Sequence, residues 1–171
     1  MKTASLPFAA ADFQIDTLED EIHVDALCCH LLRHFYNKCV EDGETPEDAG
    51  KKARGADYFL RDFMIADRRK NIFEVEAQDI TAFAGNWYIV RNLEPNMAEL
   101  QEILAGIDAF YRFCRDGGCI GETTYPPLST ACGKTEYYRQ RIDSFWEITG
   151  DGYFAWNAEC PLVPPKKENP A

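Results

Sequence analysis

Apolar residues that recur at helical spacing, between recognisable helix start and stop signals, constrain this chain more than any other feature. Between 18 and 41 they form two adjacent rows: Leu18, Ile22, Cys29, Leu32, Tyr36 and Val40, and beside them Leu27, Leu31 and Phe35. Thr17 followed by Asp20 is typical of a helix N-cap, and Gly43 ends the pattern. Since side chains three and four residues apart share one face of a helix, we expect a long first helix over 18–41.

Four further helices are predicted from the same spacing and from their end signals. The second begins after Thr45, an N-cap residue followed by a proline, and ends in a break at 69–71. The third is predicted over 76–91, and the fourth runs from an asparagine cap to a glycine pair over 96–117. A fifth covers about 134–148.

The remaining segments are predicted to be irregular. The proline pair at 126–127 is placed in a loop, and Tyr153 to Trp156 is read as a short strand or extended segment folded against the bundle. The predicted fold class is therefore all-α, a bundle of about five helices forming a single domain over 1–160. Residues 1–15 are expected to be a flexible lead-in, and the proline-rich stretch 161–171 a flexible tail.

The net charge of −11 is distributed unevenly along the chain. Acids dominate 12–48 and 74–108, whereas bases outnumber acids over 51–70. One basic segment thus separates two acidic ones. This distribution disfavours a diffuse phosphate-binding surface, because the long-range field repels a polyanion, but a local basic patch can still act within a Debye length of about 8–10 Å.

The seven cysteines include an adjacent pair, Cys28 and Cys29, and follow no metal-binding spacing. An odd number without an export signal predicts reduced, mostly buried thiols rather than a disulfide framework or a zinc site. No run approaches the roughly 18 apolar residues of a membrane span. We therefore expect a soluble, cytoplasmic protein that makes no contact with a membrane.

Part of the chain resembles a known DNA-binding module. The matching positions are Tyr58 to Phe63, Asp79-Ile80 with Phe83, and Leu104, Ile107, Phe110, Tyr111 and Phe113 with Gly118. Over residues 56–120 the chain is similar to the SAM-like core-binding domain at the N-terminus of tyrosine recombinases and phage integrases. The resemblance implies a small helical fold that binds DNA.

The chain departs from that family in two respects. After Ile120 there is no room for the recombinase catalytic domain, so we expect no strand cleavage. Helices that press on DNA in the family are basic, whereas the predicted fourth helix carries Glu99, Glu102 and Asp108. Only the basic segment, 51–70, has the positive charge that the resemblance implies.

Four bases in that segment are the candidate binding residues: Arg61, Arg68, Arg69 and Lys70. Guanidinium and ammonium groups bind phosphates, and they also steer acidic protein partners. The alternative is a solvated patch that complements the acidic first helix and holds the bundle, or a dimer, together.

Three histidines, His23, His30 and His34, share one face of the predicted first helix. His30 and His34 lie one turn apart and are candidate metal ligands, although a further ligand from another element would be needed. A solvated polar stripe is the alternative. Several aromatic residues that could stack on nucleic-acid bases are expected in the core instead: Trp87, Tyr88, Tyr137, Tyr138 and Trp146.

The sequence indicates no catalytic motif and no cofactor. It contains no glycine-rich phosphate loop, no G-x-S-x-G and no H-E-x-x-H. We therefore expect a non-catalytic acidic helical module that binds a protein partner or a second copy of itself. The alternatives are a stand-alone DNA-binding accessory protein related to recombinase core-binding domains, and a transition-metal protein that uses the histidine face.

Overall fold

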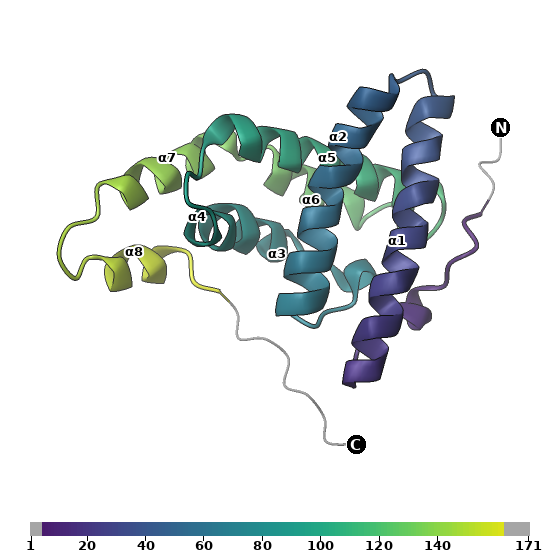
Figure 1. Ribbon diagram of the computed structural model, residues 1–171, viewed down its shortest axis with the longest axis horizontal. Helices are drawn as coiled ribbons and strands as arrows, with labels where there is room; N and C mark the ends of the chain where they lie inside the picture. The colour runs from purple at the N-terminus through teal and green to yellow at the C-terminus, as the bar shows by residue number, and fades with distance from the viewer. Residues whose placement is uncertain (1–4, 163–171) are drawn as a thin grey trace.

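The computed structural model describes residues 5–162, and its regular secondary structure is entirely helical within that range (Figure 1). The α-helices are α1 (Leu18–Glu41), α2 (Pro46–Asp57) with a π-helical continuation (Tyr58–Asp67), α3 (Ala77–Ala82), a short π-helix here called the π-turn (Phe83–Trp87), α4 (Tyr88–Arg91), α5 (Met97–Asp116), α6 (Tyr125–Cys132), α7 (Thr135–Trp146) and α8 (Tyr153–Glu159). Two short 3₁₀ helices cover Ala10–Phe13 and Ile72–Glu74. The predicted all-α class is confirmed. α2 with its continuation, and α3 to α4, each correspond to one predicted helix, but the predicted number of about five is too low, because α6 and α8 are additional helices of the described chain.

Side-chain caps explain why the helices begin where the sequence predicts. At the start of α1 the Asp20 amide donates to Thr17 Oγ1 at 3.1 Å, and the Thr17 amide donates to Asp20 Oδ2 at 2.9 Å. At α2 the Asp48 amide donates to Thr45 Oγ1, and at α5 the Glu99 amide donates to Asn96 Oδ1. Each cap satisfies backbone donors that have no partner inside the helix.

Two short segments were predicted wrongly. The proline pair at 126–127 opens α6 rather than lying in a loop, because the first helical turn needs no amide donor. Tyr153 to Trp156 is the first part of α8, neither strand nor extended segment. Its helix is only seven residues long, too short for the spacing of apolar residues to reveal.

The buried face of α1 also differs from the predicted rows. Leu18, Ile22 and Val40 are exposed, and the face that packs inward consists of Val24, Cys28, Leu31, Leu32, Phe35 and Cys39. Residues 1–15 were expected to be a flexible lead-in, but within the described part, 5–15, Phe13 and Ile15 are buried in the core. Of the predicted tail, only 161 and 162 lie within the described residues.

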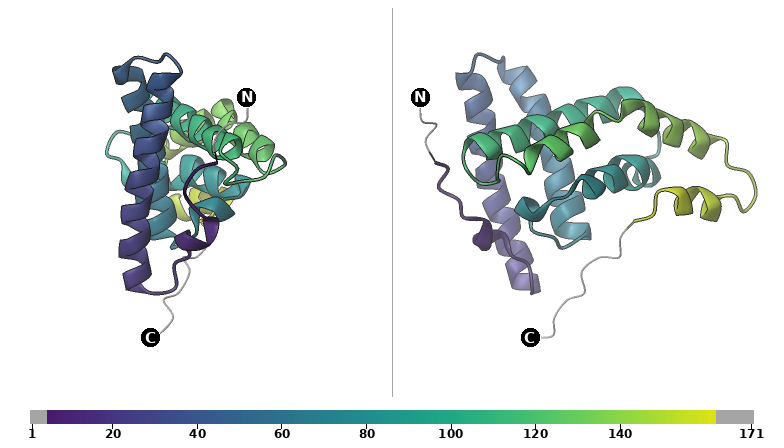
Figure 2. Two further views of the ribbon diagram at one scale, coloured as in Figure 1. Left: turned by 90° about the vertical axis from the view of Figure 1, so that its right-hand side faces the viewer. Right: turned by 180° about the vertical axis from the view of Figure 1, so that it is seen from behind.

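α1 and α2 run antiparallel side by side, and α5 crosses α2 (Figures 1 and 2). Two glycines allow the crossing. A Cβ on Gly106 would lie 2.4 Å from the Lys52 carbonyl oxygen, and one on Gly55 would lie 2.9 Å from Ile103 Cα. The backbones of α2 and α5 therefore touch at a point where no larger residue fits.

The α7–α8 hairpin lies at the far end of the molecule from α1, as both figures show. Between them the two π-helical segments face each other through aromatic rings. Phe63 lies 5.4 Å from both Phe83 and Trp87 between ring centroids. Among the described residues no helix is both long enough and apolar enough to cross a membrane.

Candidate functional site

The basic segment predicted as a binding site is largely occupied by carboxylates of the same chain. Arg61 Nε and Nη2 donate to the Asp25 carboxylate at 2.9 and 3.1 Å, and Nη1 donates to Asp57 Oδ1 at 3.1 Å. Hydrogen bonding to Asp25 raises the pKa of Arg61. The pair joins the acidic α1 to the basic second helix within one chain.

The other three predicted bases are also paired. Arg69 donates to Glu21 Oε2 on α1 at 2.9 Å from a left-handed backbone position, with φ of 51°. Lys70 donates to Asp79 Oδ2 at 2.8 Å, and Arg68 donates to Asp67 Oδ2 at 2.7 Å. Each of the four bases is thus paired with a carboxylate of the same chain. These paired charges, here called the charge-matched seam, do not form a surface of one sign.

The predicted histidine stripe lies on the outer face of α1. His23, His30 and His34 are all exposed, and the His34 ring contacts Phe8 edge-on with centroids 5.4 Å apart. Among residues 5–162 no group of three or more histidine, cysteine, aspartate or glutamate side chains is placed to hold a metal ion. The structure therefore brings no third ligand to His30 and His34.

All seven cysteines are free thiols, and five of them are buried. Burial raises the pKa of the Cys132 thiol to about 12, and it raises the pKa of Cys28 and Cys114 as well. These thiols stay protonated at neutral pH. They therefore lack the thiolate that nucleophilic or redox chemistry requires.

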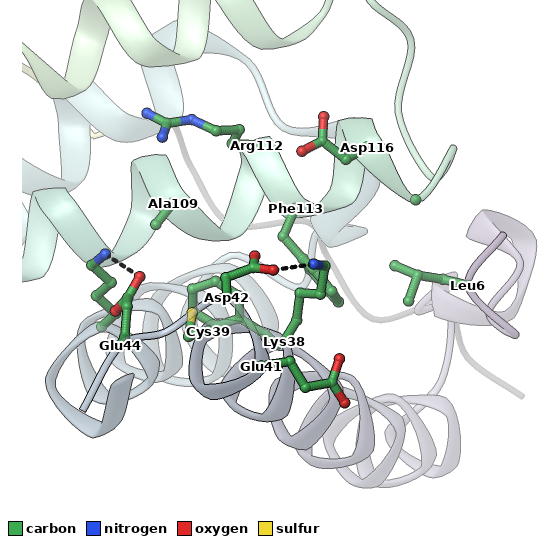
Figure 3. A pocket seen from close by; sticks show the side chains of 13 residues that line it. Leu6, Lys38, Cys39, Glu41, Asp42, Glu44, Ala109, Arg112, Phe113 and Asp116 are labelled. Atoms are coloured by element: carbon green, nitrogen blue, oxygen red, sulfur yellow. Dashed lines mark hydrogen bonds and ion pairs between the residues drawn. The ribbon is translucent and has the colours of Figure 1, made fainter. Parts of the chain in front are cut away.

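A cavity of about 340 Å³ opens between α1, α2 and α5 (Figure 3). Its floor is apolar, with Phe35 and Phe113, and its rim carries the ion pairs Lys38–Asp42 and Lys52–Glu44. In Figure 3 the side chains of Arg112 and Asp116 point away from the Lys38–Asp42 pair. Charged groups of both signs line the rim, so no single class of ligand is selected.

A group of five aromatic rings in mutual contact lies in the α7–α8 hairpin, and three of these rings are exposed to solvent. Its five rings, here called the aromatic tip, are Phe145, Trp146, Tyr153, Phe154 and Trp156. Ring-to-ring centroid distances of 6.0, 5.1, 6.1 and 6.1 Å connect them from Trp146 through Phe145, Trp156 and Tyr153 to Phe154. Trp146 is 58% exposed, Phe154 is 78% exposed and Tyr153 is 38% exposed. Trp146 was predicted to lie in the core, and this prediction is wrong.

A buried arginine holds the base of the aromatic tip. Arg141 on α7 is 3% exposed, and it donates to the carbonyl oxygens of Gly85 and Trp156, each at 2.8 Å. Its guanidinium carbon lies 3.9 Å from the Trp156 ring centroid, and Trp156 Nε1 donates back to the Arg141 carbonyl at 3.1 Å. Arg141 therefore connects α7, α8 and the π-turn that contains Gly85.

A second buried contact ties the end of α8 to the same π-turn. Asn86 Nδ2 donates to Asn157 Oδ1 at 2.8 Å and to the Cys160 carbonyl at 2.7 Å. A Cβ on Gly85 would lie 2.9 Å from Cys160 Sγ, so the glycine leaves room for α8 to approach. Buried hydrogen bonds thus fix the hairpin that carries the exposed rings to the rest of the fold.

Sequence reasoning missed the aromatic tip and its base. The available signal was two aromatic pairs, 145–146 and 153–154, on either side of the turn that contains Gly150, whose φ is 58°. No sequence signal marked Arg141, because its partner Gly85 lies 56 residues earlier in the chain and its partner Trp156 lies in another helix, α8.

Comparison with known proteins found no match for this chain: no family model, no curated protein and no solved structure is similar to it.

Proposed function

We propose that this protein is a non-catalytic helical module that binds another protein through the aromatic tip. The observation that carries the proposal is the continuous group of five rings, of which Trp146 and Phe154 are largely exposed. Exposed contiguous apolar surface is typical of interaction sites, and tryptophan and tyrosine are enriched among the residues that dominate binding energy.

The base of the tip supports this proposal. Binding costs less free energy when the contacting side chains are already ordered. Arg141 and Asn86 fix the hairpin through buried hydrogen bonds, so Trp156 offers a rigid support for its exposed neighbours. Trp156 belongs to the core and Phe145 packs against it, whereas Trp146, Tyr153 and Phe154 are left exposed.

The absence of catalysis is part of the proposal. The thiols of Cys28, Cys114 and Cys132 are kept protonated by burial, and the three histidines lie on an exposed helix face. Neither arrangement pairs a nucleophile with a base. The metal-binding alternative relies on the face with His23, His30 and His34, where the described part of the chain brings no third ligand to the pair His30 and His34.

We propose a protein partner in preference to DNA because of the charge-matched seam. Phosphate contacts by Arg61 or Arg69 would have to replace existing bonds to Asp25 and Glu21. The net charge of −11 on the chain would repel a DNA duplex. Binding of duplex DNA at low salt, weakening steeply as salt rises, would instead support the accessory protein that the recombinase resemblance implies.

Replacement of the two most exposed rings tests the proposal. We expect the full chain carrying W146A/F154A to unfold in urea with a free energy within about 1 kcal/mol of the wild type, since both side chains are largely solvated. We expect the same variant to lose its partner in affinity capture from cells that express the protein, measured by quantitative mass spectrometry.

L93A is the matched control, because Leu93 is 97% exposed and is not part of the aromatic tip. It should capture the same partner as the wild type. Capture of an unchanged set of proteins by W146A/F154A would contradict docking at the tip.

A further inference from the structure

From Ile142 onward the charged side chains of the described C-terminal hairpin are all of one sign. From Ile142 to Leu162 the chain has four acids, Asp143, Glu147, Asp151 and Glu159, and no lysine, arginine or histidine. All four acids are exposed. The surface that carries the exposed rings is therefore also the most uniformly acidic part of the C-terminal hairpin.

Helical geometry brings acids and rings together. Asp143, Trp146 and Glu147 are three and four residues apart at the end of α7, so they share its outer face. The closest base in sequence is Arg141, which is 3% exposed and donates to backbone carbonyls. Its approach to Glu159, at 3.5 Å, leaves that side chain 71% exposed. The exposed base next in sequence is Arg139, one helical turn before Asp143, and its guanidinium lies 3.8 Å from Glu136. Acids therefore outnumber exposed bases around the tip.

We infer that the partner presents a lysine- or arginine-containing peptide segment to the aromatic tip. This inference rests on the proposed function and specifies the chemistry of the partner. A cation over the face of Trp146 or Phe154 gains a cation–π contact, and its neighbours pair with Asp143, Glu147 and Asp151. Complementary charge also increases the rate of encounter.

The same charges argue against the other occupants. Two tips of the same chain facing each other would bring acids against acids, which disfavours tip-to-tip dimers. An anionic lipid surface and a nucleic acid would be repelled for the same reason. A basic segment of another protein is the occupant that both the rings and the acids fit.

The test measures the affinity of the full chain for a fluorescein-labelled peptide of alternating lysine and leucine, about eight residues long, by fluorescence anisotropy. A second peptide has glutamate in place of each lysine. We expect the lysine peptide to bind at least about tenfold more tightly than the glutamate peptide, and its affinity to fall as salt rises. Equal affinity for the two peptides, or no binding of the lysine peptide, would overturn the inference.

Two variants with matched charge locate the binding site. D143N/E147Q/D151N should weaken binding of the lysine peptide by about fivefold or more, because exposed ion pairs each contribute modestly. E19Q/E94Q/E102Q removes the same number of charges from exposed positions outside the hairpin and should change the affinity by less than about twofold. Equal weakening by both variants would show attraction to the net charge alone and would overturn the inference.

Further outcomes separate this inference from the proposed function. If W146A/F154A loses the cellular partner while D143N/E147Q/D151N keeps it, the tip is a docking site but its partner is not cationic. A dimer abolished by W146A/F154A would assign the tip to a second copy.

Discussion

Replacing Arg141 with methionine is expected to destabilise the protein by about 2–4 kcal/mol and to detach α8 from the bundle. Methionine fills most of the space but donates no hydrogen bond. The carbonyl oxygens of Gly85 and Trp156, now bonded at 2.8 Å, would lose a charged donor inside the protein. Relief of the buried Arg141 Nη2, which has no hydrogen-bond partner among the described residues, offsets part of this cost. Urea unfolding measures the loss.

R139M is the control for this substitution, because Arg139 lies on the same helix with a side chain that is 49% exposed. Its expected effect is below about 0.5 kcal/mol. Hydrogen exchange of the α8 amides, from Tyr153 to Glu159, should accelerate in R141M and not in R139M. If R141M is as stable as R139M, Arg141 does not hold the hairpin.

Replacing Gly106 with alanine is expected to cost about 3 kcal/mol, the upper end of the usual overpacking range. The new Cβ would lie 2.4 Å from the Lys52 carbonyl oxygen and 3.1 Å from the Ala56 amide nitrogen. Both atoms belong to the backbone of α2 and cannot rotate away, so α2 and α5 must separate. The free energy of unfolding in urea measures the effect.

G121A is the matched control, since its Cβ would meet no atom closer than Thr124 Oγ1 at 3.7 Å. We expect a change within about 0.5 kcal/mol for this variant. A small effect of G106A would mean that the crossing of α2 and α5 is looser than the structure shows.

Local signals predicted the long helices well. Thr17 with Asp20, and Thr45 with the proline that follows it, cap helices through contacts within a few residues. Such caps can be read from sequence because both partners are neighbours. The apolar spacing of α5 likewise predicted its buried stripe, which includes Leu104, Ile107 and Phe110.

Features that depend on distant partners could not be predicted in this way. The two apolar rows on α1 are nearly equivalent in sequence, and only the positions of its neighbours decide that Leu18 and Ile22 face solvent. Trp146 was expected in the core because its spacing resembles that of buried residues, but α7 extends beyond the bundle and leaves it exposed. Gly55 and Gly106 carried a signal that was missed, since glycine inside a helix often marks close packing.

The same distinction between local and distant contacts applies to the candidate site. Sequence analysis found the opposite charges of the first two helices and weighed a complementary patch against a binding site. The structure pairs Arg61 with Asp25 and Arg69 with Glu21 inside the chain. The aromatic tip depends on Arg141 reaching the π-turn, 56 residues earlier in the chain at Gly85, and spacing alone does not reveal such a contact.

The most direct test of the account is site-specific photo-crosslinking in cells that express the protein. A photoreactive phenylalanine analogue replaces Phe154 in one version of the full chain and Leu93 in another, since both positions are highly exposed. Docking at the aromatic tip predicts a covalent adduct with a discrete partner protein from position 154 and none from position 93. No adduct at 154, or the same adducts at both positions, would contradict the central claim.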